Sequence, residues 1–197
     1  MDHITQPEKA SNHDNMTSLE AQIRECYGRV AYSHKAHEKC ADIYHARLRL
    51  LKITQILLSS IVTGGLFVTI IGKNETSTIV SAITSAILLA LNAYTKDYDL
   101  GQLSQKHSSI AGQLWNIRES YLSLISDIRG GLLDAGSAIK KRESLQEALN
   151  NVYQSAPRTI SKAYKEAQKA LQVNEELTFS DDEIDNLLPT HLRKTRF

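Results

Sequence analysis

Several features that define common protein classes are missing from this chain, and their absence narrows what it can be. Only two of the 197 residues are cysteine, Cys26 and Cys40, which argues against a disulfide framework and favours reduced thiols in a cytosolic portion. Lys and Arg total 23 and Asp and Glu total 22, so no charge excess points to direct nucleic-acid binding. The first 16 residues are polar, which argues against a signal peptide because no apolar core is present.

Strand patterns and enzymatic motifs are missing as well. No segment shows a convincing strand pattern and only three prolines interrupt the chain, so an all-α protein is expected. Nothing resembles a phosphate-binding glycine loop, a zincin motif or a nucleophile elbow, and the carboxylates are scattered on polar helix faces. The sequence therefore predicts that the chain is not an enzyme, with no catalytic residue and no cofactor.

What the chain does contain is a pair of uncharged apolar runs in its middle. They occupy residues 53–72 and 76–95, and each counts 20 residues. As helices, both would span about 30 Å, which is the thickness of the hydrocarbon core of a bilayer. Since only three residues separate them, the sequence predicts a transmembrane hairpin over 51–96.

The Lys and Arg residues next to the spans predict the orientation of this hairpin. Three of them precede the first span and two follow the second, whereas the turn carries only Lys73. This asymmetry predicts that both termini are cytoplasmic and that the turn lies outside. Tyr94 and Tyr98 fall where an aromatic belt is expected on the cytoplasmic side. The five flanking residues are Arg47, Arg49, Lys52, Lys96 and Lys106.

The regions that flank the hairpin have the periodicity of helices with an apolar seam. Thr17-x-x-Glu20 predicts a capping box that opens a helix over 17–50, which leads directly into the first span. After the second span, apolar positions recur at alternating steps of three and four, so a helix over 97–129 is expected to continue that span without a break. Both helices leave one hairpin on the same side, so we expect them to pack antiparallel. The seam positions of the second helix are Leu100, Leu103, His107, Ile110, Leu114, Ile117, Tyr121, Leu124 and Ile128.

The two ends of the chain are predicted to be less regular. Residues 1–16 are expected to form a disordered leader. A glycine-rich joint follows the seam helix, and two amphipathic helices are then expected over 137–175, the second starting near Pro157. In residues 176–197, a capping box that opens at Ser180 predicts a short helix, and a basic, mobile tail is expected after it.

Both predicted spans hold more polar residues than a simple anchor needs, and two interpretations stay open. Small and hydroxyl residues let membrane helices pack closely and bond to each other. A water-filled lumen in an oligomer would use the same residues, because an amide at membrane depth needs water or a partner. The candidates for lining a pore or joining helices are Gln55, Ser59, Thr63, Ser81, Ser85 and Asn92.

Histidine and cysteine also gather on the predicted seams. His34, His37 and Cys40 stand three residues apart on one helix, and His107 lies at a comparable depth on the other. Imidazole and thiolate ligands at this spacing could bind zinc. Isolated histidines on helix seams are more often packed and hydrogen-bonded, however, so the sequence assigns no metal ligand.

The segment that leaves the second span, residues 91–128, carries motifs more specific than its periodicity requires. They are an Asn-x-Tyr at the span exit, the run DYDL, a His-x3-Ala pair that starts at His107, and the segment LWxxRExYxxL that starts at Leu114. In these motifs the chain resembles the SLATT family, bacterial proteins with two transmembrane helices flanked by cytosolic helices. The resemblance covers about 17–175, including the extra C-terminal helices of one subgroup.

This resemblance implies a membrane effector of bacterial conflict systems, encoded beside enzymes that make nucleotide second messengers or beside reverse transcriptases. Such relatives are thought to perforate or depolarise the host membrane when infection is sensed. The family supplies no catalytic motif. The residues that match its pattern, which we interpret as packing or signal-transmission residues, are Tyr94, His107, Trp115, Arg118, Glu119 and Tyr121.

The sequence therefore predicts an all-α, two-span protein of the bacterial inner membrane that forms a pore gated by a cytosolic helical bundle. It is expected to be a homo-oligomer, because a single hairpin cannot enclose a path for water. Besides the lipid bilayer, the expected partner is genetic: a second-messenger synthase or a reverse transcriptase. The alternative is a membrane-tethered helical scaffold or sensor, in which the hairpin only anchors a partner-binding bundle.

Overall fold

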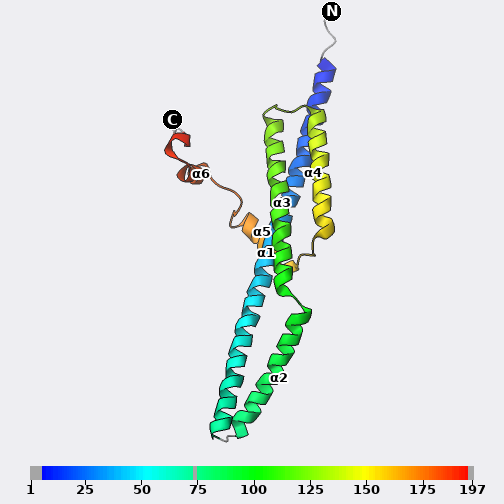
Figure 1. Ribbon diagram of the computed structural model, residues 1–197. Coiled ribbons are helices and arrows are strands. Elements are labelled where there is room, and N and C mark those ends of the chain that lie inside the picture. Colours follow the sequence, from blue (N-terminus) through cyan, green and yellow to red (C-terminus); the bar gives the residue numbers. More distant parts are fainter. Residues whose placement is uncertain (1–5, 73–74, 195–197) are drawn as a thin grey trace, which may run out of the picture.

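The structure is an elongated set of helices, with a two-helix hairpin at one end and a bundle at the other (Figure 1). The computed structural model describes the backbone of residues 6–72 and 75–194, and side chains from Asn15 onward. Every regular element in these ranges is a helix and none is a strand, which confirms the all-α prediction. In chain order the elements are α1 (Gln6–Gly72), α2 (Glu75–Asp97), α3 (Leu100–Arg129), α4 (Ala135–Ser155), α5 (Ser161–Gln172), α6 (Asp181–Leu187) and the 3-10 turn η1 (Thr190–Leu192).

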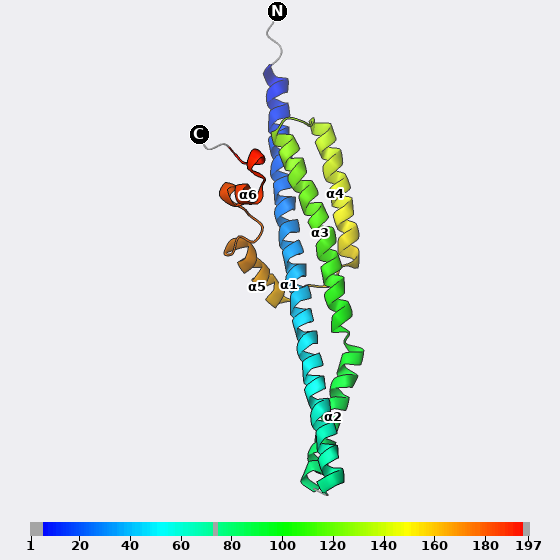
Figure 2. The same ribbon diagram turned by 60° about the vertical axis from the view of Figure 1, so that its left-hand side comes forward.

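Helix α1 runs from one end of the molecule to the other without a break (Figure 2). Its 67 residues extend over about 100 Å. The prediction that the first cytosolic helix leads directly into the first span is therefore confirmed. The predicted start at residue 17 is wrong, because α1 already begins at Gln6 and no capping box opens it at Thr17. No proline or glycine lies between residues 8 and 27, so a helix that has begun can propagate through this stretch.

The second span, in contrast, does not continue smoothly into the bundle, and this prediction was wrong. Helix α2 ends at Asp97 and α3 begins at Leu100. The Asp99 side chain caps the new helix by accepting a hydrogen bond of 2.8 Å from the backbone N–H of Gln102. An aspartate is a strong helix start signal, and here its effect outweighs the unbroken apolar periodicity.

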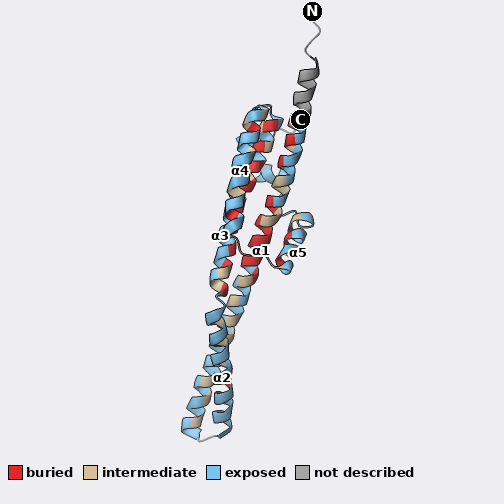
Figure 3. Ribbon diagram, turned by 90° about the vertical axis from the view of Figure 1, so that its right-hand side faces the viewer, coloured by how far each residue is buried: buried red, intermediate tan, exposed pale blue. Residues whose placement is uncertain are grey.

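The core of the bundle lies where α3 packs antiparallel along α1, and Figure 3 shows the buried residues gathered there. Eight of the nine predicted seam residues on α3 are buried and Leu103 is half-buried, so the periodicity identified the correct face. Helix α4 packs on α3 and completes the main core, while α5 packs on α1 around Cys40. The buried members of the main core are Leu19, Ile23, Val30, Ile110, Leu114, Ile117, Tyr121, Leu124, Ile128, Ala138 and Val152.

The C-terminal elements follow the predicted order with one shift. Helix α5 begins at Ser161 rather than near Pro157, and residues 156–160 form an extended linker that crosses from α4 to α5. The capping box at Ser180 is confirmed: the Ser180 hydroxyl accepts from the Glu183 N–H, and the Glu183 carboxylate accepts from the Ser180 N–H. Residues 195–197 of the predicted tail, like residues 1–5 of the predicted leader, lie outside the described residues.

Candidate functional site: the polar faces of the hairpin and the histidines of the bundle

The hairpin exposes apolar side chains on most of its surface. Helices α1 and α2 each contain a stretch long and apolar enough to cross a membrane. Leu57, Phe67 and Ile70 are exposed by 59%, 66% and 78%, values that suit lipid rather than water as the surroundings. Against this apolar background, the polar residues of the two spans fall into an inner and an outer group.

The inner group joins α1 to α2 within the hairpin. Gln55 Nε2 donates a hydrogen bond of 2.9 Å to Asn92 Oδ1, so each amide finds a partner at membrane depth. Further along, the hydroxyl oxygens of Thr69 and Ser77 lie 2.7 Å apart. Three of the six candidate residues, namely Gln55, Asn92 and Ser81, thus lie at the contact between the two spans.

Ser81 lies against Gly65 at the contact between the two spans. Its side chain is buried, and it occupies the space where a Cβ atom at position 65 would stand. A larger residue at position 65 would require the Ser81 hydroxyl to turn away or the two helices to move apart. A glycine that faces a serine is the kind of small-residue contact that lets membrane helices pack closely.

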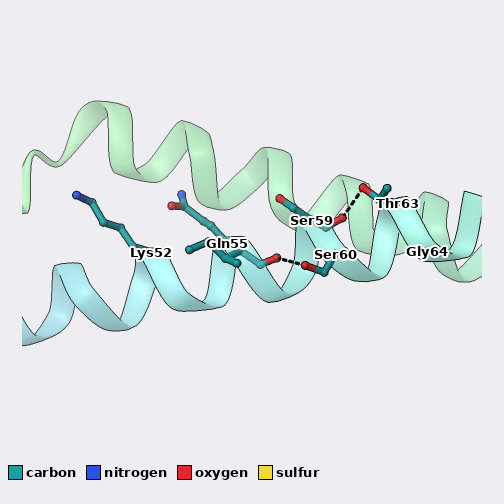
Figure 4. Close-up of a pocket in the computed structure, with 7 residues that line it drawn as sticks. Lys52, Gln55, Ser59, Ser60, Thr63 and Gly64 are labelled. Atoms are coloured by element: carbon teal, nitrogen blue, oxygen red, sulfur yellow. Dashed lines mark hydrogen bonds between the residues drawn. The ribbon is translucent and has the colours of Figure 1, made fainter.

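The outer group lies on exposed faces of the two spans. Ser59, Thr63 and Ser85 are exposed. The first two, together with Gln55 and Ser60, line a groove of about 680 Å³ along α1 between Lys52 and Gly64 (Figure 4). The Thr63 hydroxyl donates to the Ser59 carbonyl at 2.9 Å. A hydroxyl that bonds to its own helix can face either lipid or water without losing that hydrogen bond.

In the bundle, the structure brings together histidines that are far apart in the sequence. His37 on α1 and His107 on α3 place their Nδ1 atoms 2.9 Å apart. His34 lies one turn from His37, and its Nε2 atom is 3.5 Å from the Glu38 carboxylate. Within the described ranges, no three His, Cys, Asp or Glu side chains are arranged to hold a metal ion.

The other residues that match the family pattern divide between the core and the surface. Tyr121 is fully buried, and burial is the main cause that raises its pKa to about 12. Arg118 is buried and donates from Nε to Glu119 Oε1 at 2.9 Å. Trp115 is exposed by 47%, and Tyr94 stacks on Tyr98 beside the break between α2 and α3, with ring centroids 5.0 Å apart.

A charged contact that the sequence did not predict ties the C-terminal segment to α1. Lys35 Nζ lies 2.8 Å from carboxylate oxygens of both Glu38 and Glu176, and Lys39 Nζ lies 3.4 Å from Glu176. The hydrogen bond from Lys35 is the main cause that lowers the pKa of Glu176 to about 2. The two partners are 141 residues apart in the chain, so no local pattern could have indicated their pairing.

These features define the class of protein: an all-α protein with a two-span hairpin attached to a helical bundle. Residues 19–183 match the model of a family described as "SMODS and SLOG-associating 2TM effector domain family 4". The chain therefore belongs to the SLATT family, and it is a membrane effector domain of conflict systems. Effector domains of this family are not known as enzymes. Comparison with curated proteins and with solved structures gave no match.

Proposed function

We propose that this chain is a pore-forming or membrane-disrupting effector of bacterial abortive infection, which oligomerises through its hairpin and its cytosolic helices. In this proposal it resides in the inner membrane with both termini in the cytoplasm, and a second-messenger synthase or a reverse transcriptase is its genetic partner. The observation that carries the proposal is the groove along α1 that Ser59, Ser60 and Thr63 line, in a hairpin whose surface otherwise exposes mainly apolar side chains.

The division of the polar residues supports this assignment. A single hairpin has no interior for water, so several hairpins must pack together to enclose a path. Gln55, Asn92 and Ser81 are already engaged between α1 and α2. The candidate residues not engaged in this contact are Ser59 and Thr63, together with Ser85 on α2, and all three are exposed. They are the ones left for facing a lumen.

The test is leakage of a fluorescent solute from liposomes that contain the purified full chain. We expect the double variant Ser59→Ala, Thr63→Val to leak several-fold less than the parent, because the groove loses two of its three hydroxyl groups and keeps only that of Ser60. The matched control is Leu57→Val, Ile61→Val, which changes two exposed apolar residues of the same helix that do not line the groove. This control should leak like the parent.

Two results would contradict the proposal. Equal leakage from the Ser59→Ala, Thr63→Val variant and the parent would remove this face from the lumen. If the parent does not leak under any activating condition that arrests growth in cells, the membrane-tethered scaffold becomes the better assignment. In that case, replacement of the hairpin by an unrelated two-span anchor should preserve the growth arrest.

A further inference from the structure

Three buried histidines meet where α1 faces α3, and we call His34, His37 and His107 the histidine layer. They are exposed by only 4%, 4% and 0%. The rings of His37 and His107 have centroids 4.9 Å apart, and Tyr44 stacks on His107 from the hairpin side at 5.5 Å. His37 lies 15 residues before Lys52, about 22 Å along an unbroken helix from the first span.

The histidine layer leaves polar atoms without hydrogen bonds. Among the described residues, His34 Nδ1, His107 Nε2 and Arg118 Nη1 are buried and have no partner. An unpaired buried polar atom costs free energy, so the surrounding apolar contacts must hold this layer closed. The layer is therefore a weak point in the packing of α1 against α3.

We call His37 and His107 the central pair of the layer. The charged residues that face the layer do little to stabilise a proton on this pair. On α1, Glu38 and Lys35 adjoin His34, and on α3 so do Arg118 and Glu119. The pKa of His37 is lowered by burial and then by the neighbouring His107 and His34, and the pKa of His107 is lowered by burial. No carboxylate is among the causes for either ring.

The groups that reach the central pair from the remaining elements are not acidic either. Tyr153 on α4, Arg158 on the 156–160 linker and Tyr164 on α5 line a groove of about 450 Å³ together with His37. Arg47 lies over the Tyr44 ring at 5.9 Å. An imidazolium at His37 or His107 would thus be buried without a counter-charge of its own.

The distance between the two rings also limits how many protons they can hold. At 2.9 Å between the Nδ1 atoms, one ring must donate and the other must accept, so a single hydrogen lies between them. A fully protonated pair would place two N–H groups against each other, and the contact would break. A singly protonated pair would bury a positive charge that no neighbouring carboxylate offsets.

We propose that the histidine layer is a proton-responsive contact, which holds α1 against α3 while its rings are neutral and releases the two helices in acid. Only the consequence for a pore rests on the proposed function: α1 passes unbroken from this layer into the first span, so loosening at the layer would reach the hairpin. The opening of the bundle itself can be measured without any assumption about conductance.

The direction of the pH effect follows from the ionisation of the rings. Burial is the main cause that lowers the pKa of His37 to about 4, and burial also lowers the pKa of His34 and of His107. In the open state the rings regain a pKa near 6.5. The open state therefore binds more protons between about pH 6.5 and pH 4, and the closed state loses stability as the pH falls through this window. For His37 alone, the ratio of closed to open protein falls about tenfold between about pH 7.5 and about pH 5.5.

The experiment uses the full chain in detergent micelles and a native reporter, Cys40, which is fully buried on α1 one turn from His37 and is covered by Ala163 of α5. We expect α5 to detach when the adjacent histidine layer opens, so that exposure of Cys40 reports the opening. Cys40 is modified with an aromatic disulfide reagent and quantified by peptide mass spectrometry. Each rate is divided by the rate of the denatured protein at the same pH, which removes the effect of pH on thiol reactivity. We expect the normalised rate to rise about tenfold from about pH 7.5 to about pH 5.5.

The double variant His37→Gln, His107→Gln should abolish this rise, and the matched control His45→Gln, an exposed histidine on the same helix, should keep it. A parent rate that does not change with pH, or a rise that survives in the double variant, would overturn the proposal. Histidine NMR titration of the parent needs no variant: His37 and His107 must titrate well below 6.5 in the closed protein, and an ordinary pKa for both would overturn the proposal as well.

Discussion

At the scale of single residues, identical neighbours in the sequence can have different surroundings in the structure. Gly64 and Gly65 are neighbours, yet only Gly65 faces the second span, where Ser81 fills the space beside it. A Cβ atom at Gly64 would meet nothing within 4 Å. The helical rotation between two successive residues decides which of them lies at the contact.

This difference leads to a prediction with a built-in control. Gly65→Val should separate α1 from α2 and destabilise the hairpin by about 1–3 kcal/mol, the usual range for overpacking, whereas Gly64→Val should not. Disulfide formation between Thr69→Cys and Ser77→Cys, whose native hydroxyl oxygens lie 2.7 Å apart, reports the contact. Equal cross-linking in both valine backgrounds would show that the spans do not approach each other at Gly65.

At the scale of the elements, the two spans are attached to the bundle in different ways. Helix α1 transmits its position rigidly from bundle to hairpin, because it has no break. Helix α2 is separated from α3 by Tyr98 and Asp99, so it can change its angle to the bundle while α1 and α3 stay packed. A signal that acts on the bundle would reach the first span more directly than the second.

The packing of α1 against α3 depends on a few fully buried side chains. Leu114 is exposed by 0% and Leu122, eight residues further along α3, by 43%. Leu114→Asp would bury a carboxylate without a partner, which costs several kcal/mol, so we expect the bundle to open or the protein to misfold. Leu122→Asp should leave the bundle intact. Thermal unfolding followed by circular dichroism measures both, and equal midpoints for the two variants would contradict the assigned core.

At the scale of the whole molecule, the elongated shape separates a bundle that contains most of the buried residues from a hairpin whose residues are mostly exposed (Figure 3). The Lys and Arg residues that flank the spans predict that the bundle is cytoplasmic and that the turn near residue 74 lies outside. A cysteine placed by Asn74→Cys should react in intact cells with a reagent that does not cross the membrane. A cysteine placed by Asn150→Cys, on the exposed side of α4, should react only after lysis. The reverse pattern would invert the topology and place the histidine layer outside the cytoplasm.

The sequence by itself determined the features that depend on neighbouring residues in the chain. Two charge-free runs determined the spans, since their length and polarity must match a bilayer. The alternating steps of three and four determined which face of α3 is buried, because helical periodicity assigns a residue to a face. The same local reasoning missed the break at Asp99, where one capping side chain competes with a periodicity that continues on both sides.

Only the tertiary structure decided which faces meet and which partners pair. Periodicity predicted that Gln55 and Asn92 lie on polar faces, but their bond to each other, with Ser59 and Thr63 facing outward, depends on how α1 and α2 are rotated in the hairpin. The contacts of His37 with His107 and of Lys35 with Glu176 join residues 70 and 141 positions apart. A sequence pattern identifies which residues share a helix face, whereas the packing of distant helices determines which residues that face contacts.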